Sequence, residues 1–137
     1  MRDHRVAQAA PVMAKMWDND DRLVRIFVLQ YCSAVRAPET FEIAWRAYST
    51  LPEKHELRIS AVGAMAACVQ KLDALAKRAI PLILEHYSQD GFDAREQFEA
   101  ALCRAAGREP KARPTDEPAD IAQRLEEWKA WWRKAAN

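Results

Sequence analysis

Residues 11–25 read PVMAKMWDNDDRLVR, and a stretch with the same layout returns twice in the chain. Residues 81–95 read PLILEHYSQDGFDAR, so proline and arginine again stand fourteen positions apart (25 − 11 = 14 and 95 − 81 = 14). The middle copy, AWRAYSTLPEKHELR, spans residues 44–58 and carries Ala44 where the other two have proline. The arginines are 33 and 37 positions apart (58 − 25 and 95 − 58), and this spacing indicates a tandem array of helical repeats.

The segment around each arginine has the hydrophobic periodicity of a helix. Apolar residues stand at positions −1, +3, +7 and +10 relative to the arginine in all three copies. These offsets place four side chains on one face of a helix with about 3.6 residues per turn. The twelve apolar residues are Val24, Val28, Cys32, Val35, Leu57, Ala61, Met65, Cys68, Ala94, Phe98, Leu102 and Ala105. We therefore predict that each copy is a helix, an acidic turn and a second helix.

The apolar pattern and the turn residues together predict six helices in the three copies and one more after them. The expected ranges are residues 3–17, 22–36, 39–50, 54–70, 72–88, 92–106 and a last helix within 119–137. The expected inward faces hold Val6, Ala10, Met13 and Trp17 in the first helix, Ile43, Ala44, Ala47 and Tyr48 in the third, and Leu72, Leu75, Ala79, Ile80, Ile83 and Tyr87 in the fifth.

Three positions within these helices carry specific expectations. We expect Pro11 either to kink the first helix or to mark its start, and Pro81 to kink the fifth. Gly63 lies inside the fourth helix, where glycine costs about 1 kcal/mol relative to alanine. The small residues of this helix either let another helix approach closely or leave a shallow groove, and we expect close packing to be the reason for Gly63.

An acidic residue stands five positions before each arginine, which gives the pairs Asp20 and Arg25, Glu53 and Arg58, and Asp90 and Arg95. A carboxylate there lies near the start of the second helix, where it can accept hydrogen bonds from free backbone N–H groups. The arginine follows about one turn later and can reach the acid of a neighbouring copy. We interpret the six residues as a structural ladder between stacked copies, with the arginines partly exposed to solvent.

These features together resemble the HEAT-repeat family. The motif occurs as Ala-Pro-Val at residues 10–12 with Val-Arg at 24–25, and as Ile-Pro-Leu at 80–82 with Ala-Arg at 94–95. The middle copy departs from the family pattern because it lacks the proline, which predicts a straighter first helix there, and the third copy has alanine where the family prefers valine. The resemblance covers residues 3–107. It implies an all-α fold, a short right-handed α-solenoid of about three helix pairs, and it leaves the function open.

The composition changes after Gly107. Residues 108–118 read REPKARPTDEP, with three prolines and six charged residues, and this pattern predicts an extended linker. We therefore expect three parts: helical repeats over residues 1–107, a linker over 108–118, and a Trp-rich capping helix over 119–137. The last helix is capped at Asp120 or Pro118 in this interpretation.

The last helix contains three of the five tryptophans. One stripe on this helix is formed by Ile121, Leu125, Trp128 and Trp132. The stripe favours a cap that covers the third repeat, and a Trp-x-x-Trp-Trp ending is similar to that of bacterial HEAT-like proteins with short arrays. Trp131 lies roughly 80° from the stripe on a helical wheel. The alternative is therefore a docking helix with Trp131 as the anchor for a partner.

The charges nearly balance, with 21 Lys and Arg against 20 Asp and Glu, so the chain lacks the basic excess of a nucleic-acid-binding protein. The densest basic cluster is Arg104, Arg108, Lys111 and Arg113. The sequence contains no apolar segment long enough for a membrane span and no signal-peptide core, so we expect a cytoplasmic protein.

The three cysteines, Cys32, Cys68 and Cys103, fall one in each copy and form no CxxC motif. We expect them to be reduced, buried apolar residues, and the histidines stand at no metal-ligand spacing from them. The sequence therefore predicts neither a metal site nor a cofactor.

No recognisable catalytic motif is present, and we expect a non-catalytic interaction module or adaptor that binds a protein partner. The candidate binding residues are exposed positions of the second helices, together with the last helix: Gln30, Ser33, Arg36, Gln70, Gln97, Arg104 and Trp131. One alternative is a small helical subunit of a larger assembly, or an inhibitor or immunity-type protein. Another is a HEAT-like nucleic-acid-binding protein or DNA glycosylase, which needs a basic concave face and an acid beside aromatic residues.

Overall fold

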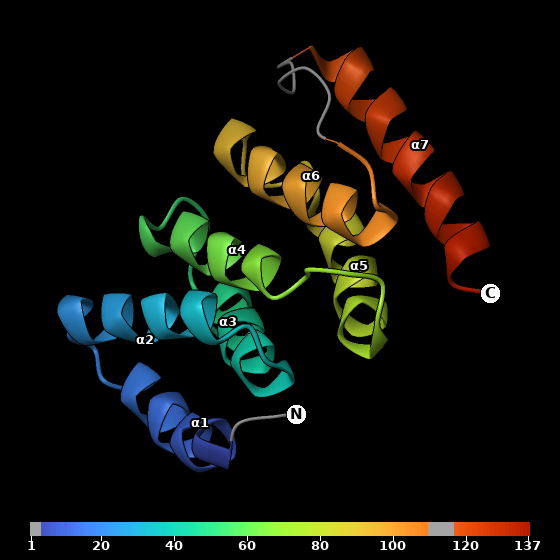
Figure 1. The fold of residues 1–137 in the computed structure, drawn as a ribbon. Coiled ribbons are helices and arrows are strands. Elements are labelled where there is room, and N and C mark those ends of the chain that lie inside the picture. The colour runs from blue at the N-terminus through green and yellow to red at the C-terminus, as the bar shows by residue number, and fades with distance from the viewer. Residues whose placement is uncertain (1–3, 110–116) are drawn as a thin grey trace. The chain divides into compact units, whose positions relative to one another are not determined.

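The computed structural model describes residues 4–109 and 117–137, and every regular element in these ranges is a helix (Figure 1). The helices are α1 (His4–Trp17), α2 (Arg22–Val35), α3 (Pro38–Thr50), α4 (Leu57–Ala67), α5 (Ala74–His86), α6 (Phe92–Ala106) and α7 (Pro118–Ala135). The prediction of an all-α protein is thus confirmed over the described residues. Residues 110–116 of the predicted linker, which include Lys111 and Arg113, lie outside the described residues.

The helix boundaries agree with the expected ranges to within two residues, except in α4. The helix expected over 54–70 is shorter at both ends, because Lys54 adopts a left-handed φ of 65° and α4 ends at Ala67. The helix expected over 72–88 begins later. Asp73 is its N-cap and accepts a hydrogen bond from the backbone N–H of Ala76 at 2.9 Å.

The chain forms two compact units, Met1–Cys68 and Val69–Asn137. In the first unit, α1 packs on α2 and α3 packs on α4, so the unit consists of two helical hairpins. The first helices of the two hairpins contact each other, and so do the second helices, α2 and α4 (Figure 1). In the second unit, α5 contacts both α6 and α7. The predicted repeat region, residues 1–107, therefore extends over both units.

The predicted inward faces form most of the core. Ten of the twelve apolar positions of the second helices are buried, and Val24 and Val35 are half-buried. The expected faces of α1 and α3 are buried as well, with Ala10, Met13 and Trp17 in α1 and all four expected residues in α3. The side chain of Val6, which was also expected to face inward, lies outside the described part of the structure. Leu72 is the exception: it lies before the start of α5 and is 42% exposed, so its predicted inward position is wrong.

Pro11 and Pro81 both lie inside their helices, with exposed side chains. Because α1 begins at His4, Pro11 does not mark the start of its helix. Ala44, which the sequence alignment places opposite these prolines, is completely buried. The three positions are therefore not equivalent in the structure.

A buried aromatic residue before each arginine shows which positions of the three copies are equivalent. Trp17 follows Pro11 by six positions, and Tyr87 follows Pro81 by six (17 − 11 and 87 − 81). The buried aromatic of the middle copy is Tyr48, and six positions before it stands the exposed Glu42. The arginine follows the buried aromatic residue by ten positions in the middle copy and by eight in the other two. An alignment of the copies on their arginines is therefore two residues out of register in the first helix of the middle copy.

Gly63 in α4 has open space around it. A Cβ atom built on Gly63 would have no neighbouring heavy atom within 4 Å, apart from the local helix backbone. The expectation of close helix packing at this glycine is therefore wrong.

Candidate partner-binding surfaces

The acid expected to cap the second helix in the first copy is displaced by one residue. Asp21, not Asp20, is the N-cap of α2 and accepts hydrogen bonds from the backbone N–H groups of Leu23 at 2.9 Å and Val24 at 3.2 Å. The Asp20 side chain is fully exposed and lies 3.7 Å from the Arg25 guanidinium. In the first copy, this ion pair lies within one hairpin.

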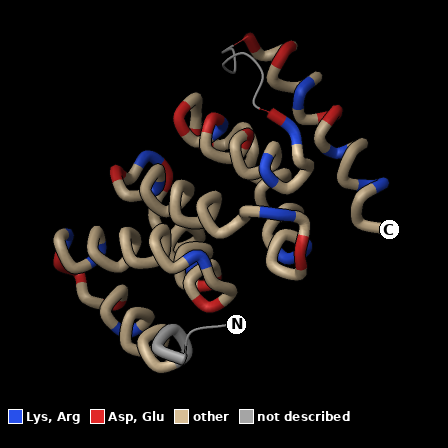
Figure 2. Tube along the Cα trace, in the orientation of Figure 1, with Lys and Arg blue, Asp and Glu red and all other residues tan. Residues whose placement is uncertain are grey.

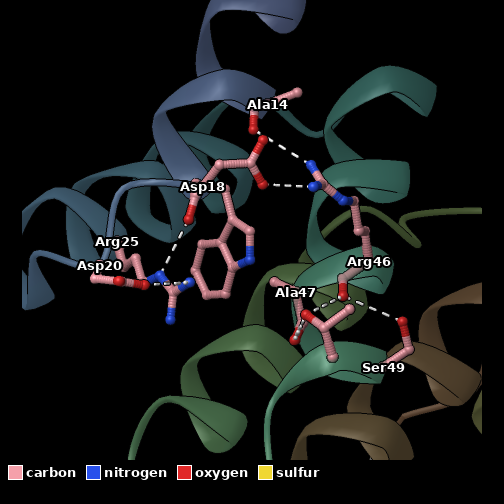
Figure 3. A network of polar contacts seen from close by, with 9 residues as sticks. Ala14, Asp18, Asp20, Arg25, Arg46, Ala47 and Ser49 are labelled. Carbon is pink, nitrogen blue, oxygen red and sulfur yellow. Dashed lines mark hydrogen bonds and ion pairs between the residues drawn. The ribbon is translucent and has the colours of Figure 1, made fainter.

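Arg25 closes the end of the preceding helix (Figure 3). Its Nε donates a hydrogen bond to the carbonyl oxygen of Trp17, the last residue of α1, at 3.0 Å. Its guanidinium also stacks on the Trp17 ring, 4.6 Å from the centroid. The terminal carbonyls of a helix lack partners within that helix, so the arginine supplies a donor where one is missing. Arg46 of α3 reaches the same helix end through Asp18 and the Ala14 carbonyl.

Arg58 makes the equivalent contacts at the end of α3 in the second hairpin. It donates hydrogen bonds to the carbonyl oxygens of Tyr48 at 3.3 Å and Leu51 at 2.8 Å, and it stacks 4.3 Å from the Tyr48 ring centroid. Arg58 is only 6% exposed, so the expectation of a partly solvated side chain is wrong. Glu53, the acid five positions before Arg58, is exposed.

In the third copy Arg95 is buried in α6, with its guanidinium 6.0 Å from the Phe92 ring centroid. Asp90 is half-buried. The ladder between neighbouring copies stays a prediction. The role that the structure assigns to Arg25 and Arg58 had a signal in the sequence, which is the aromatic residue eight or ten positions before each arginine.

An exposed apolar ridge runs along α2. Leu23 is 71% exposed and Phe27 is 53% exposed, and both are among the large apolar residues that remain open to solvent. Gln30 and Ala34 continue the exposed line at helical spacing. We name Leu23, Phe27, Gln30 and Ala34 the α2 ridge. No charged residue occurs between Ile26 and Val35, and in Figure 2 most of α2 is accordingly uncharged.

The other predicted binding residues fall in both units. Arg36 is exposed at the end of α2 and donates from Nε to the carbonyl of the half-buried Ser33 at 3.2 Å. Gln70 and Gln97 are exposed in the second unit. Arg104 is half-buried and donates from Nε to the Val69 carbonyl at 2.9 Å, so it braces the chain before α5. The first unit thus holds Gln30, Ser33 and Arg36, and the second unit holds the remaining candidates.

A buried carboxylate joins the three helices of the second unit. Glu99 of α6 is 8% exposed and accepts hydrogen bonds at Oε2 from the Tyr87 hydroxyl and the Trp128 indole N–H, both at 2.8 Å. Its Oε1 accepts from Arg124 Nε at 2.6 Å. Burial and the bond to Glu99 raise the pKa of Tyr87 well above its usual value. We name Glu99, Tyr87, Arg124 and Trp128 the Glu99 cluster.

Sequence reasoning missed the Glu99 cluster apart from its two aromatic residues. The signal in the sequence was Glu99 itself. It is a charged residue between Phe98 and the apolar residues that follow, at a position that helical periodicity places on the buried face. An acid beside aromatic residues is also what a base-excising enzyme would require. Here both carboxylate oxygens already accept bonds from the chain's own side chains, and the bonds from Arg124 and Trp128 attach α7 to α6.

Trp131 lies beside the Glu99 cluster and is half-buried. Its ring meets the Trp128 ring edge-on, with centroids 5.5 Å apart, and lies 5.9 Å from the Trp132 ring. An open groove at this place is lined by Arg108, Glu127, Ala130, Trp131 and Lys134. We name these five residues the α7 groove. Trp128 is the buried member of the predicted tryptophan stripe, and Ile121, Leu125 and Trp132 are half-buried.

The three cysteines are free thiols and buried, as predicted. Burial raises the pKa of Cys32 to about 12 and that of Cys68 to about 11, so both thiols stay protonated at neutral pH. Within residues 4–109 and 117–137, no group of three or more His, Cys, Asp or Glu side chains is arranged to hold a metal ion.

Over the same described ranges, none of the helices combines the length and the hydropathy that crossing a membrane requires. No protein-family model, curated protein or solved structure matches this chain.

Proposed function

We propose that this protein is a non-catalytic interaction module, built from HEAT-like helical hairpins, that binds a protein partner through the α2 ridge. The observation that carries the proposal is the exposure of Leu23 and Phe27, one turn apart on the same helix. A contiguous apolar surface on a folded chain is characteristic of an interaction site. Burial of a fully exposed side chain of this size stabilises a complex by roughly 1.5–3 kcal/mol.

The chemistry of the ridge favours a protein as the partner. The ridge carries no lysine or arginine to contact phosphates, and phosphate contacts supply most of the affinity for nucleic acids. Because residues 26–35 are uncharged, a partner that covers them removes no charge of this helix from water. A partner with its own apolar side chains fits this surface.

The assignment to HEAT-like repeats is supported by the similarity of the two hairpins in the first unit. In both hairpins an arginine of the second helix bonds the terminal carbonyls of the first helix and stacks on its buried aromatic. The second helices pack beside each other, and in repeat proteins such a layer commonly forms the binding side. The α2 ridge lies on this layer.

Affinity capture from cells of the source organism, with quantitative mass spectrometry, tests the proposal. The test variant is Leu23→Ser with Phe27→Ser, and the control is Val12→Ser, which changes a side chain of α1 that is 58% exposed. We expect a specific protein that the wild type and the control recover equally and the double variant does not. Once purified, the recovered partner should bind the wild-type protein directly.

Equal recovery of every protein by all three forms would refute the assignment of the binding site to the α2 ridge. Circular dichroism of the variants confirms that a loss of binding is not a loss of fold. The substitutions are at exposed positions, where changes usually alter stability by less than about 0.5 kcal/mol.

A further inference from the structure

We propose that the α7 groove is a second binding site, which takes an acidic peptide segment of a partner protein. In this site Arg108 and Lys134 bind a carboxylate of the peptide, and an apolar side chain next to that carboxylate packs on Trp131. The inference concerns the second unit and is independent of whether the α2 ridge binds a partner.

The aromatic part of the groove is held in place before any ligand arrives. Trp128 is buried and its indole N–H is bound to Glu99. The Trp131 ring rests edge-on against Trp128, and the Arg108 guanidinium lies over the Trp128 ring, 5.1 Å from its centroid. A ligand therefore meets side chains that are already ordered, which lowers the entropy cost of binding.

The electrostatics of the groove favour an anion. Within the part of the chain that the structure describes, neither Arg108 nor Lys134 forms an ion pair. The acids of α7 are already engaged, since Glu127 lies 3.6 Å from Arg124 and Glu126 lies 3.7 Å from Lys129. The two cations of the groove thus remain available to a negatively charged group.

The type of anion follows from Glu127, which lines the same groove. Its charge opposes a phosphate, which carries about −1.5 to −2 at neutral pH, more strongly than a carboxylate with a single charge. Trp131 and Ala130 provide an apolar surface between the charged residues. An acidic peptide with an apolar residue beside its carboxylate satisfies both parts of the groove.

Nuclear magnetic resonance of the full chain with a matched series of peptides tests this inference. The probe peptide is Gly-Ser-Glu-Glu-Phe-Glu-Glu-Ser-Gly. In one control peptide glutamine replaces each glutamate, and in the other alanine replaces the phenylalanine. The signal is the indole N–H resonance of Trp131, which the Trp131→Phe variant assigns by its absence. We expect the probe peptide to shift this resonance with a Kd of about 1 mM or lower.

The chain offers a matched pair of variants for the charge. Lys134→Gln and Arg133→Gln each remove one positive charge from consecutive exposed residues, but only Lys134 lines the groove. We expect Lys134→Gln to weaken binding about threefold and Arg133→Gln to leave it nearly unchanged, because a local contact and not net charge attracts the peptide. Both control peptides should bind at least about threefold more weakly than the probe.

Three results would overturn the proposal. The first is the absence of any shift of the Trp131 resonance at millimolar probe peptide. The second is an equal loss with Lys134→Gln and Arg133→Gln, which indicates general electrostatic attraction. The third is an equal response to inorganic phosphate or to a thymidine oligonucleotide, which indicates an unselective anion site.

Discussion

Two arginines with the same place in the repeat, Arg25 and Arg58, differ in their exposure to solvent. The Arg25 side chain is 23% exposed and has Asp20 nearby, whereas Arg58 is buried and donates to two carbonyl oxygens. Both close the end of a helix, but only Arg58 does so away from water. A buried carbonyl that loses its donor costs more free energy than an exposed one, because water cannot replace the lost bond.

We therefore expect Arg58→Ala to lower the free energy of unfolding by about 2–3 kcal/mol. Arg25→Ala should cost about 1 kcal/mol or less, because its contacts are partly solvated. Urea unfolding followed by circular dichroism measures both values. Equal losses for the two variants would contradict the role of burial.

The open space around Gly63 predicts a gain in stability on substitution, in contrast to the losses expected for the two arginines. Gly63→Ala should raise the free energy of unfolding by about 1 kcal/mol, because alanine favours the helix and its methyl group meets no neighbour. Thermal unfolding of the two proteins under identical conditions measures the change. A lower melting temperature for the variant would mean that the methyl group meets an obstacle.

The buried thiols predict a dependence on alkaline pH. The ordinary cysteine pKa is 9.0, and burial raises it to about 12 for Cys32 and about 11 for Cys68. As the pH rises from 9 toward 11, the unfolded chain loses these protons while the folded chain keeps them. The free energy of unfolding therefore falls, by at most about 1.4 kcal/mol per pH unit and thiol.

Urea unfolding at several alkaline pH values measures this slope. The matched control is the double variant Cys32→Ala with Cys68→Ala, in which the slope should be smaller by the contribution of the two thiols. An identical slope in the wild type and the double variant would rule out this origin for the pH dependence.

At the scale of elements, α7 depends on a few polar contacts with its neighbours. Most of its side chains are exposed or half-buried, and Trp128 is the buried one. The bonds of Glu99 to Arg124 and Trp128 connect α7 to α6, and the bond to Tyr87 extends the cluster to the end of α5. A buried carboxylate with several donors specifies one position for the helix, because any displacement leaves charged groups without partners.

Glu99→Ala should consequently lower the stability of the second unit by about 3 kcal/mol, because it leaves the buried Tyr87 and Trp128 donors without their acceptor and removes the closer of the two carboxylates that pair with Arg124. The exposed Gln97, on the same helix, provides the control, and Gln97→Ala should cost less than about 0.5 kcal/mol. Denaturant unfolding followed by tryptophan fluorescence reports the loss. Similar values for the two variants would contradict the structural role of Glu99.

At the scale of the whole molecule, the contacts divide the chain after Cys68. The first unit has its own core between two hairpins, and the second has a core to which α5, α6 and α7 contribute. Units of this kind often open separately, and local stability then differs between them.

Hydrogen exchange of the full chain tests this separation. Glu99→Ala should speed amide exchange in α5, α6 and α7 and leave the rates in α1 to α4 within about twofold. Arg58→Ala should do the reverse, with faster exchange in α3 and α4. Uniform acceleration along the chain in either variant would show that the two units unfold as one.

Local pattern alone was sufficient to predict the helices and most of their buried faces. The spacing of Val28, Cys32 and their counterparts depends only on the geometry of one helix, in which residues three and four apart share a face. The same reasoning found the buried, reduced cysteines. Helix ends were predicted less well where a backbone conformation decides them, as at Lys54.

Packing between distant residues decided the rest. Glu99 meets Arg124 and Trp128 across 25 and 29 positions, and no local rule relates side chains at that distance. Leu23 and Phe27 belong to residue types that are usually buried, and only the arrangement of the neighbouring helices leaves them exposed. Helical periodicity thus shows which residues share a face, whereas the tertiary structure determines which faces find a partner and which remain open to bind one.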